Sequence, residues 1–331
     1  MRVLVARTAL DAATGDDGLV TSIRSTGYHR TEGEKSGVSA LDESFGGARV
    51  SVEPSDEVEV SASLLRVAYS PGLAPDEPVR KRFAFTGDEL TLGGCDVRAA
   101  IGDLDVACEV AGTSSGGTAA LAAARLSRRS ARMRAGVAHL SRDYWSPLGG
   151  GAPGFSGGSN GAVGWAAAEY RARTGWRIWG SARVTGRPWR SYGSELPNGS
   201  SSAGIGCEVR VGDGLRLAVE STYRSRVDSV GDPTRTRASA DRRIRATLHT
   251  GGPSPVVLSV WRNSSLSDGL EDGSLLAASL RASGSVGDRT SYVAGLTSAY
   301  LHESAPSLVC YEPRLPGEFG LASLNASGTR W

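Results

Sequence analysis

The stretch from Gly204 to Arg224 constrains the fold most, because apolar and polar residues alternate strictly on both sides of a turn. The turn is Gly212-Asp213-Gly214, a sequence that favours a tight hairpin. A period of two is typical of a β-strand with two different faces. The sequence therefore predicts a β-hairpin with one apolar face and one face that carries charges of both signs. In water the apolar face would cover a core, whereas in lipid it would form the wall of a barrel.

The same alternation recurs along the chain. It is clear over 49–53, 58–64 and 104–110, where Val, Leu and Cys residues alternate with Glu, Asp, Arg and Ser. The one alanine-rich run, Ala119–Leu126, lies between Gly116-Gly117 and Ser127–Ser130 and has the length of a strand. No apolar run reaches the roughly 18 residues that a transmembrane helix needs. We therefore expect an all-β protein.

Short and long connections alternate between the expected strands. The short turns are expected at Pro54-Ser55, Gly102-Asp103, Ser127–Ser130, Arg173–Gly175, Gly212–Gly214, Thr250–Pro253 and Val286–Asp288. The longer connections are expected at 70–82, 113–117, 143–160, 186–200, 226–237, 264–272 and 303–315, of which 113–117 is the weakest member. A β-sandwich has no reason to keep such a rule, but outer-membrane barrels have short periplasmic turns and longer outer loops.

Strand length and aromatic placement favour the same fold. The alternating segments are about 9–13 residues long, which suits a strand that crosses a bilayer at a tilt. Many aromatic residues lie at the expected strand ends, as in the interfacial girdles of barrels. They are Tyr144, Trp145, Tyr170, Trp176, Trp189, Tyr192, Tyr223, Trp261, Tyr300 and Tyr311, whereas Trp165, Trp179 and Tyr292 are expected in mid-strand. We therefore predict an antiparallel up-and-down transmembrane β-barrel of about 16 strands, within a range of roughly 14–18.

The chain is expected to divide at residue 45. Residues 46–331 are assigned to the barrel, and residues 1–45 to N-terminal strands or a partly irregular segment, with candidate strands at 1–10, 19–29 and 38–45. The apolar run Met1–Ala6 is too short for a signal peptide. A barrel bound for the bacterial outer membrane needs such a signal, so we expect that this chain lacks the N-terminal part of its protein.

Composition and residue spacing argue against several other functions. The net charge of +2 does not suit a nucleic-acid binder driven by charge. The four cysteines, at 95, 108, 207 and 310, show no metal-ligand spacing, and the four histidines have no partner pattern that would make a catalytic triad. We expect no catalytic residues, no metal and no cofactor. Cys95 and Cys108 are best interpreted as small apolar surface residues. A disulfide between their two strands is the alternative that stays open.

The polar faces of the strands are the expected functional surface. If the apolar faces meet lipid, the charged residues of the alternating segments point into the lumen. These candidates are Glu57, Glu59, Asp96, Arg98, Asp105, Glu109, Glu208, Arg210, Arg216, Glu220, Arg224, Asp241, Arg243 and Arg245. They would either orient solutes in an open pore or fill a closed lumen with salt bridges, and the sequence leaves both interpretations open.

Five segments carry a resemblance to a known family. They are Arg142–Gly150, Gly158–Gly161, Gly175–Ile178 and Arg187–Gly193, followed late in the chain by Tyr311–Gly317. Their order and spacing resemble those of the barrel region of the bacterial ComEA-like helix-hairpin-helix/β-barrel proteins, over roughly 70–331. The helix-hairpin-helix part is not matched, so the resemblance implies no direct nucleic-acid binding by this chain. The final Trp331 resembles the terminal aromatic residue that barrel-assembly machinery recognises in outer-membrane proteins.

The resulting expectation is a non-catalytic outer-membrane β-barrel that acts as a passive channel or as an envelope anchor. Its expected partners are outer-membrane lipid, the barrel-assembly machinery and small solutes. The alternative is a soluble or surface-displayed β-sandwich binding module, with carbohydrate as a candidate ligand.

Overall fold

The computed structural model describes residues 1–24, 31–76, 82–147, 161–172, 174–189, 197–212, 214–230, 232–251, 255–267, 270–286, 290–303, 308–313, 319–324 and 328–330. Strands dominate these residues, with one short helix, α1 (Glu32–Ser36). The strands are β1 (Arg2–Leu10), β2 (Ala12–Thr14), β3 (Val20–Ile23), β4 (Leu41–Ser55), β5 (Val58–Leu73), β6 (Gly87–Ile101), β7 (Leu104–Thr113), β8 (Thr118–Ser127), β9 (Ala131–Leu140), β10 (Gly161–Arg171), β11 (Trp176–Arg187), β12 (Asn198–Val211), β13 (Leu215–Val230), β14 (Asp232–Thr250), β15 (Val256–Ser267), β16 (Leu270–Val286), β17 (Thr290–Glu303), β18 (Leu308–Pro313), β19 (Phe319–Leu324) and β20 (Gly328–Arg330).

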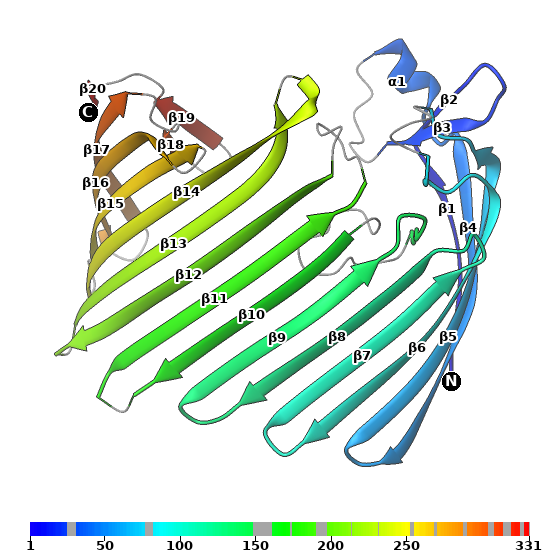
Figure 1. Cartoon of the computed structure of the whole chain (residues 1–331), viewed down its shortest axis with the longest axis horizontal. Helices are drawn as coiled ribbons and strands as arrows, with labels where there is room; N and C mark the ends of the chain where they lie inside the picture. The colour runs from blue at the N-terminus through cyan, green and yellow to red at the C-terminus, as the bar shows by residue number, and fades with distance from the viewer. Residues whose placement is uncertain are drawn as a thin grey trace. The chain divides into compact units, whose positions relative to one another are not determined.

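Successive long strands pair as antiparallel hairpins (Figure 1). In the described part of the chain, one sheet contains 18 strands, and β18 and β19 form a separate pair. A single parallel contact joins Val20 of β3 to Leu73 of β5. The predicted all-β, antiparallel up-and-down architecture is confirmed. Among the described strands, the sheet is not closed into a barrel.

The chain divides into two compact units. Unit 1 contains Met1–Leu126, Arg134–Gly164 and Thr185–Asn198, and unit 2 contains Ser127–Met133, Trp165–Val184 and Gly199–Trp331. The boundary expected at residue 45 lies inside β4, which begins at Leu41 and continues to Ser55.

The hairpin expected at Gly204–Arg224 is confirmed. Strand β12 pairs with β13 in a continuous antiparallel register from Gly199 and Val227 to Val211 and Leu215. Gly212 in the turn has a φ of +67°, a backbone conformation that glycine adopts without strain. The alanine-rich run also forms a strand as predicted, namely β8.

Several expected connections are wrong. Residues 226–237 and 264–272 were expected to be long loops, but β13 ends at Val230 before β14 begins at Asp232, and β15 ends at Ser267 before β16 begins at Leu270. The first turn also lies two residues later than expected, between Ser55 and Val58. The polar residues of these segments are typical of loops. Backbone groups nevertheless continue to pair past the point where apolar alternation stops.

Strands are consequently longer than the predicted range. Strand β14 has 19 residues, β16 has 17, and β5 and β13 have 16 each. An apolar alternation marks only the part of a strand whose faces differ in environment, so the pattern underestimates the total length.

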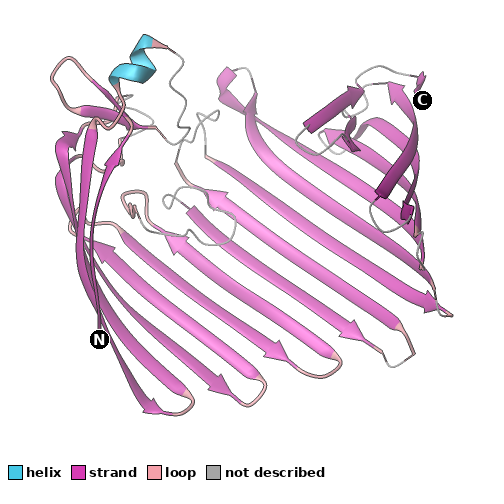
Figure 2. Cartoon of the chain, turned by 180° about the vertical axis from the view of Figure 1, so that it is seen from behind, coloured by secondary structure: helices cyan, strands magenta, loops and turns pink. Residues whose placement is uncertain are grey.

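The N-terminal segment pairs with the first hairpin of unit 1. Strand β1 pairs with β4 along its whole length. Helix α1 (Glu32–Ser36) lies between the candidate strands 19–29 and 38–45. The first of these candidates contains β3 (Val20–Ile23), and its residues 25–29 lie outside the described residues. Figure 2 shows α1 beside one end of the paired strands.

A small apolar core lies at that end of unit 1. The buried side chains come from β2, β3, β4, β5 and β6 and from Phe85. They are Ala12, Val20, Leu41, Phe45, Val67, Tyr69, Leu73, Phe85, Leu90 and Leu92, with Leu10, Ala40, Leu65 and Trp145 packed against them. Among the described residues, no helix is long and apolar enough to cross a membrane.

Candidate functional site

The register of unit 1 separates the side chains into two chemically different faces. Val60 pairs with Val52 and with Val97, and Val97 pairs in turn with Cys108. Directly paired residues lie on the same face of a sheet. The face defined by these pairs is apolar, yet Val52, Val60 and Val97 are exposed. Nothing among the described residues covers this face as the second layer of a sandwich would.

Unit 2 has an equivalent face. Cross-strand pairs join Val219 to Cys207 on one side and to Ala246 on the other, and Ala246 pairs with Val260. We use the name apolar belt for the exposed apolar residues on this face of each unit. Its larger members are Val3, Val5, Val50, Val52, Val60, Leu64, Val97, Val110, Ile205, Val211, Leu217, Val219, Ile244, Leu258, Val260, Leu276, Leu280 and Leu296.

Charged residues limit the apolar belt toward the strand ends that lie farthest from the turn between Ser55 and Val58 in unit 1 and from the turn between Val211 and Leu215 in unit 2. On this face of unit 1, Arg66 pairs with Glu89, and Arg7 forms an ion pair with Asp42 at 3.0 Å. In unit 2, Arg242 lies directly opposite Tyr223. The apolar run of β13 from Leu215 to Tyr223 has close to the roughly 9–11 residues with which a tilted strand crosses a bilayer. The remaining residues of the long strands extend beyond the apolar belt.

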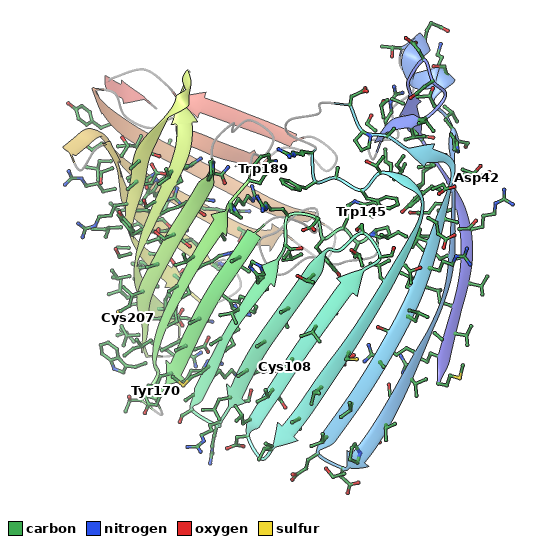
Figure 3. All side chains as sticks on the ribbon, turned by 45° about the vertical axis from the view of Figure 1, so that its right-hand side comes forward. Asp42, Cys108, Trp145, Tyr170, Trp189 and Cys207 are labelled. Atoms are coloured by element: carbon green, nitrogen blue, oxygen red, sulfur yellow. The ribbon has the colours of Figure 1, made fainter. Side chains whose placement is uncertain are left out.

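The positions of the cysteines agree with the division of the strands into an apolar face and a polar face. Cys95, Cys108 and Cys207 are free, and Cys95 and Cys108 are exposed. Cys95 pairs with Val110, and Cys108 pairs with Val97, so the two thiols lie diagonally across β6 and β7 on the apolar face. Figure 3 shows Cys108 near the middle of its strand.

The opposite face of unit 1 carries a network of ion pairs. The guanidinium Nη2 of Arg49 lies 2.9 Å from Oδ1 of Asp96 and 3.9 Å from Oε1 of Glu59. Arg98 is 3.6 Å from the same Asp96 oxygen. Arg49 also donates a hydrogen bond to Ser61, which is 2% exposed. This network joins β4, β5 and β6 and balances charge locally.

All five strand residues predicted for the polar face of unit 1 lie on that face: Glu59, Asp96, Arg98, Asp105 and Glu109. Glu57 lies in the turn before β5 instead. Arg49 is not among the predicted residues, although it alternates with Val50 and so shares their face. Arg49 is the residue that connects the acidic side chains of two strands.

The predicted polar residues of unit 2 also share one face. They are Glu208, Arg210, Arg216, Glu220, Arg224, Asp241, Arg243 and Arg245. Arg243 donates a hydrogen bond to Asn263, and Arg245 donates one to Ser259. Asp241 lies 3.8 Å from Arg226, a residue that is not among the predicted ones. Arginines outnumber carboxylates on this face.

Some aromatic residues do not form a girdle. Trp145 stacks on Phe85 with ring centroids 5.3 Å apart, and it lies 5.7 Å from Tyr69. Trp189 makes an edge contact with Phe83 at 4.8 Å, and Arg142 lies over the same Phe83 ring. We call these residues the aromatic cluster. Figure 3 shows Trp145 and Trp189 at the same end of the strands of unit 1.

The prediction of strand-end girdle positions is therefore wrong for Trp145 and Trp189, which pack against other aromatic rings. It is also wrong for Trp261, which lies mid-strand on the polar face opposite Arg245. Tyr223 lies within β13 rather than at its end. Tyr170 and Trp176 do lie at strand ends and are exposed. Tyr192 and Trp331 fall outside the described residues.

The connection that carries Trp145 is held by close backbone contacts. Ser141 accepts a hydrogen bond from the backbone N–H of Thr118 at 2.8 Å. Gly117 approaches the backbone of Asp143 and Tyr144 so closely that a Cβ atom would overlap it. Burial raises the pKa of the Tyr144 hydroxyl, and the charge of Glu109 raises it further.

The described residues contain no group of three or more His, Cys, Asp or Glu side chains that could hold a metal ion. The described strands present two extended faces rather than a set of converging catalytic groups. The arrangement can separate an apolar environment from a charged one.

Comparisons with known proteins give no family. No protein-family model matches the sequence, and no curated protein matches it. Among solved structures, the chain is similar to OccAB2 of Acinetobacter baumannii, with 9% identity and a TM-score of 0.38 over 78% of this chain and 75% of that chain. The all-β, antiparallel fold class rests on the strand pairing itself.

Proposed function

We propose that this chain forms a membrane-spanning β-barrel of the bacterial outer membrane and acts as a non-catalytic, passive channel. The observation that carries the proposal is the apolar belt. Large apolar side chains are exposed along one face of successive strands, while the opposite face carries charged residues. Leaving so much apolar surface in water is unfavourable, and an extended patch of this kind marks a protein or membrane contact.

Closure of the sheet is part of the proposal. In lipid, an open sheet edge would leave backbone N–H and C=O groups without partners, and only helices and closed barrels avoid this cost. The polar face would then line the lumen. Outer-membrane lipid, small solutes and the assembly machinery are the proposed partners, and membership of the ComEA-like helix-hairpin-helix/β-barrel family is proposed from the sequence resemblance alone.

The proposal is favoured over a soluble β-sandwich binding module by the exposure of the belt. A sandwich buries the apolar faces of two sheets against each other. Val60, Leu64 and Val219 are 39%, 60% and 41% exposed, so no second layer among the described residues covers them. An anchor for a separate periplasmic domain would use the same apolar belt. A conductance measurement distinguishes the two roles, because only a channel conducts ions.

The experiment is refolding from inclusion bodies into detergent micelles, with and without boiling before a denaturing gel. A closed barrel is expected to migrate differently before and after boiling and to show a β-rich circular dichroism spectrum. The refolded protein is then inserted into a planar bilayer, where a channel gives single-channel steps. A chain that stays soluble and folded without detergent would overturn the membrane assignment. A heat-modifiable barrel without conductance would support the anchor and reject the channel.

A further inference from the structure

We infer that a row of basic side chains on the polar face of unit 2 makes the proposed channel prefer anions. The row consists of Arg210, Arg216, His249 and Arg281. This inference rests on the proposed function, because it assigns the polar face to a conducting lumen. It adds the class of solute that this face favours.

The register places these side chains at one level across five neighbouring strands. Arg210 of β12 pairs with Arg216 of β13, which pairs with His249 of β14. His249 pairs with Val257 of β15, and Val257 pairs with Arg281 of β16. Directly paired residues lie about 4.5–5.5 Å apart between their Cα atoms, and a strand spacing is about 4.8 Å. Arg210 and Arg216 therefore lie within one Debye length of each other at about 0.1 M salt, and Arg281 lies about three strand spacings, roughly 14 Å, from Arg216.

The row is not part of an ion-pair network in the described residues. No ion pair or hydrogen bond of the Arg210, Arg216 or Arg281 side chain is found there, and all three residues are exposed. The polar face of unit 1 differs, because Arg49 and Arg98 contact Asp96. Like charges placed directly opposite each other destabilise a strand pair. The Arg210–Arg216 pair therefore has no structural benefit of its own and is available to a mobile anion.

The rest of the polar face of unit 2 also carries more positive than negative side chains. The described side chains on the polar face of β12–β16 include Arg210, Arg216, Arg224, Arg226, Arg243, Arg245 and Arg281 against Glu208, Glu220 and Asp241. The next level of the face is neutral on β14 and β15, where Thr247 and Ser259 are buried and hydrogen bonded to each other at 3.3 Å. Arginine rings are a known means of selecting anions in pores, because they raise the local anion concentration.

Lipid headgroups do not suit this site. The row lies on the face opposite the apolar belt, so a membrane phospholipid that contacts the belt does not reach it. A small anion in the lumen reaches the row. The row lies near the short-turn ends of β12, β13 and β14, where it would act on solutes as they pass that end of the lumen.

The test is the reversal potential of the refolded full chain in a planar bilayer under a potassium chloride gradient. The wild-type channel is expected to be more permeable to chloride than to potassium by about twofold or more. The triple variant Arg210→Gln/Arg216→Gln/Arg281→Gln is expected to move this ratio towards one. The matched control, Arg242→Gln/Arg262→Gln, removes two arginines from the opposite face of the same sheet and should keep the wild-type ratio.

The outcomes separate the two proposals. A heat-modifiable barrel that gives no current rejects the channel itself. A conducting wild-type channel that prefers potassium, or a triple variant with an unchanged ratio, overturns the basic row while leaving the channel intact. An equal loss of selectivity in the control would also overturn it. If the triple variant does not fold, Arg216→Gln alone, at the centre of the row, gives the same test with a smaller expected change.

Discussion

At the scale of single residues, the buried pair of Tyr69 and Glu43 links polar chemistry to the apolar core of unit 1. The Tyr69 hydroxyl donates a hydrogen bond of 2.8 Å to Glu43, and these residues are 3% and 6% exposed. Tyr69→Phe removes the donor and leaves the buried carboxylate with one partner fewer. We expect a loss of about 1–3 kcal/mol in the free energy of unfolding, measured by urea titration of the refolded protein. Tyr170→Phe, at an exposed strand end, is the control; an equal loss in both variants would contradict this prediction.

Gly117 is a second residue with a specific steric role. A Cβ atom there would overlap backbone atoms of Asp143 and Tyr144, which cannot rotate away as a side chain would. Gly117→Ala is expected to displace the connection that carries Trp145 and to destabilise the protein by about 1–3 kcal/mol. The emission of Trp145 should shift to the red in a background where the other tryptophans are replaced. Gly46→Ala, where nothing lies within 4 Å of the added Cβ, should leave both quantities unchanged.

At the scale of the strand, the two faces of β13 should respond differently to the same charge. Val219 lies in the middle of the apolar run, and its neighbour Ala218 lies on the polar face opposite Glu208. In a bilayer, Val219→Arg is expected to cost about 2–4 kcal/mol, because a strand residue at the midplane would place its charge in hydrocarbon. Ala218→Arg should cost little. The comparison requires equilibrium unfolding from lipid vesicles.

A soluble protein would give a different result for this pair of variants. Val219 is exposed, so in water an arginine there would be tolerated. Equal and small effects of the two substitutions would therefore contradict the membrane assignment of β13.

At the scale of the whole molecule, the native cysteines of both units should report one environment. Cys95 and Cys108 of unit 1 and Cys207 of unit 2 all lie on the apolar face. In a Cys310→Ala background reconstituted in bilayers, we expect these thiols to react slowly with a charged maleimide and readily with an apolar one. The physical reason is that a charged reagent does not enter hydrocarbon.

A thiol on the other face provides the matched control for this experiment. Thr222 is exposed and pairs with Arg243, so Thr222→Cys should react rapidly with the charged maleimide. The same rapid reaction at Cys95, Cys108 and Cys207 would show that the apolar face meets water.

The sequence by itself determined the all-β class, the two-faced strands and the hairpin at Gly204–Arg224. These are local properties, because side chains alternate between the two faces of a strand with a period of two. The same alternation placed Glu59, Asp96, Glu208 and Arg245 on polar faces, and it could also have identified Arg49 from its position beside Val50.

Only the tertiary structure decided which residues meet across strands. The sequence did not predict that Arg49 contacts Asp96, that Arg210 lies opposite Arg216, or that Trp145 packs on Phe85. Register depends on how separate segments pair, and a shift of one residue would reverse the faces of a strand. Strand ends were also misjudged at Val230 and Ser267, because backbone pairing continues where the side-chain pattern no longer marks it.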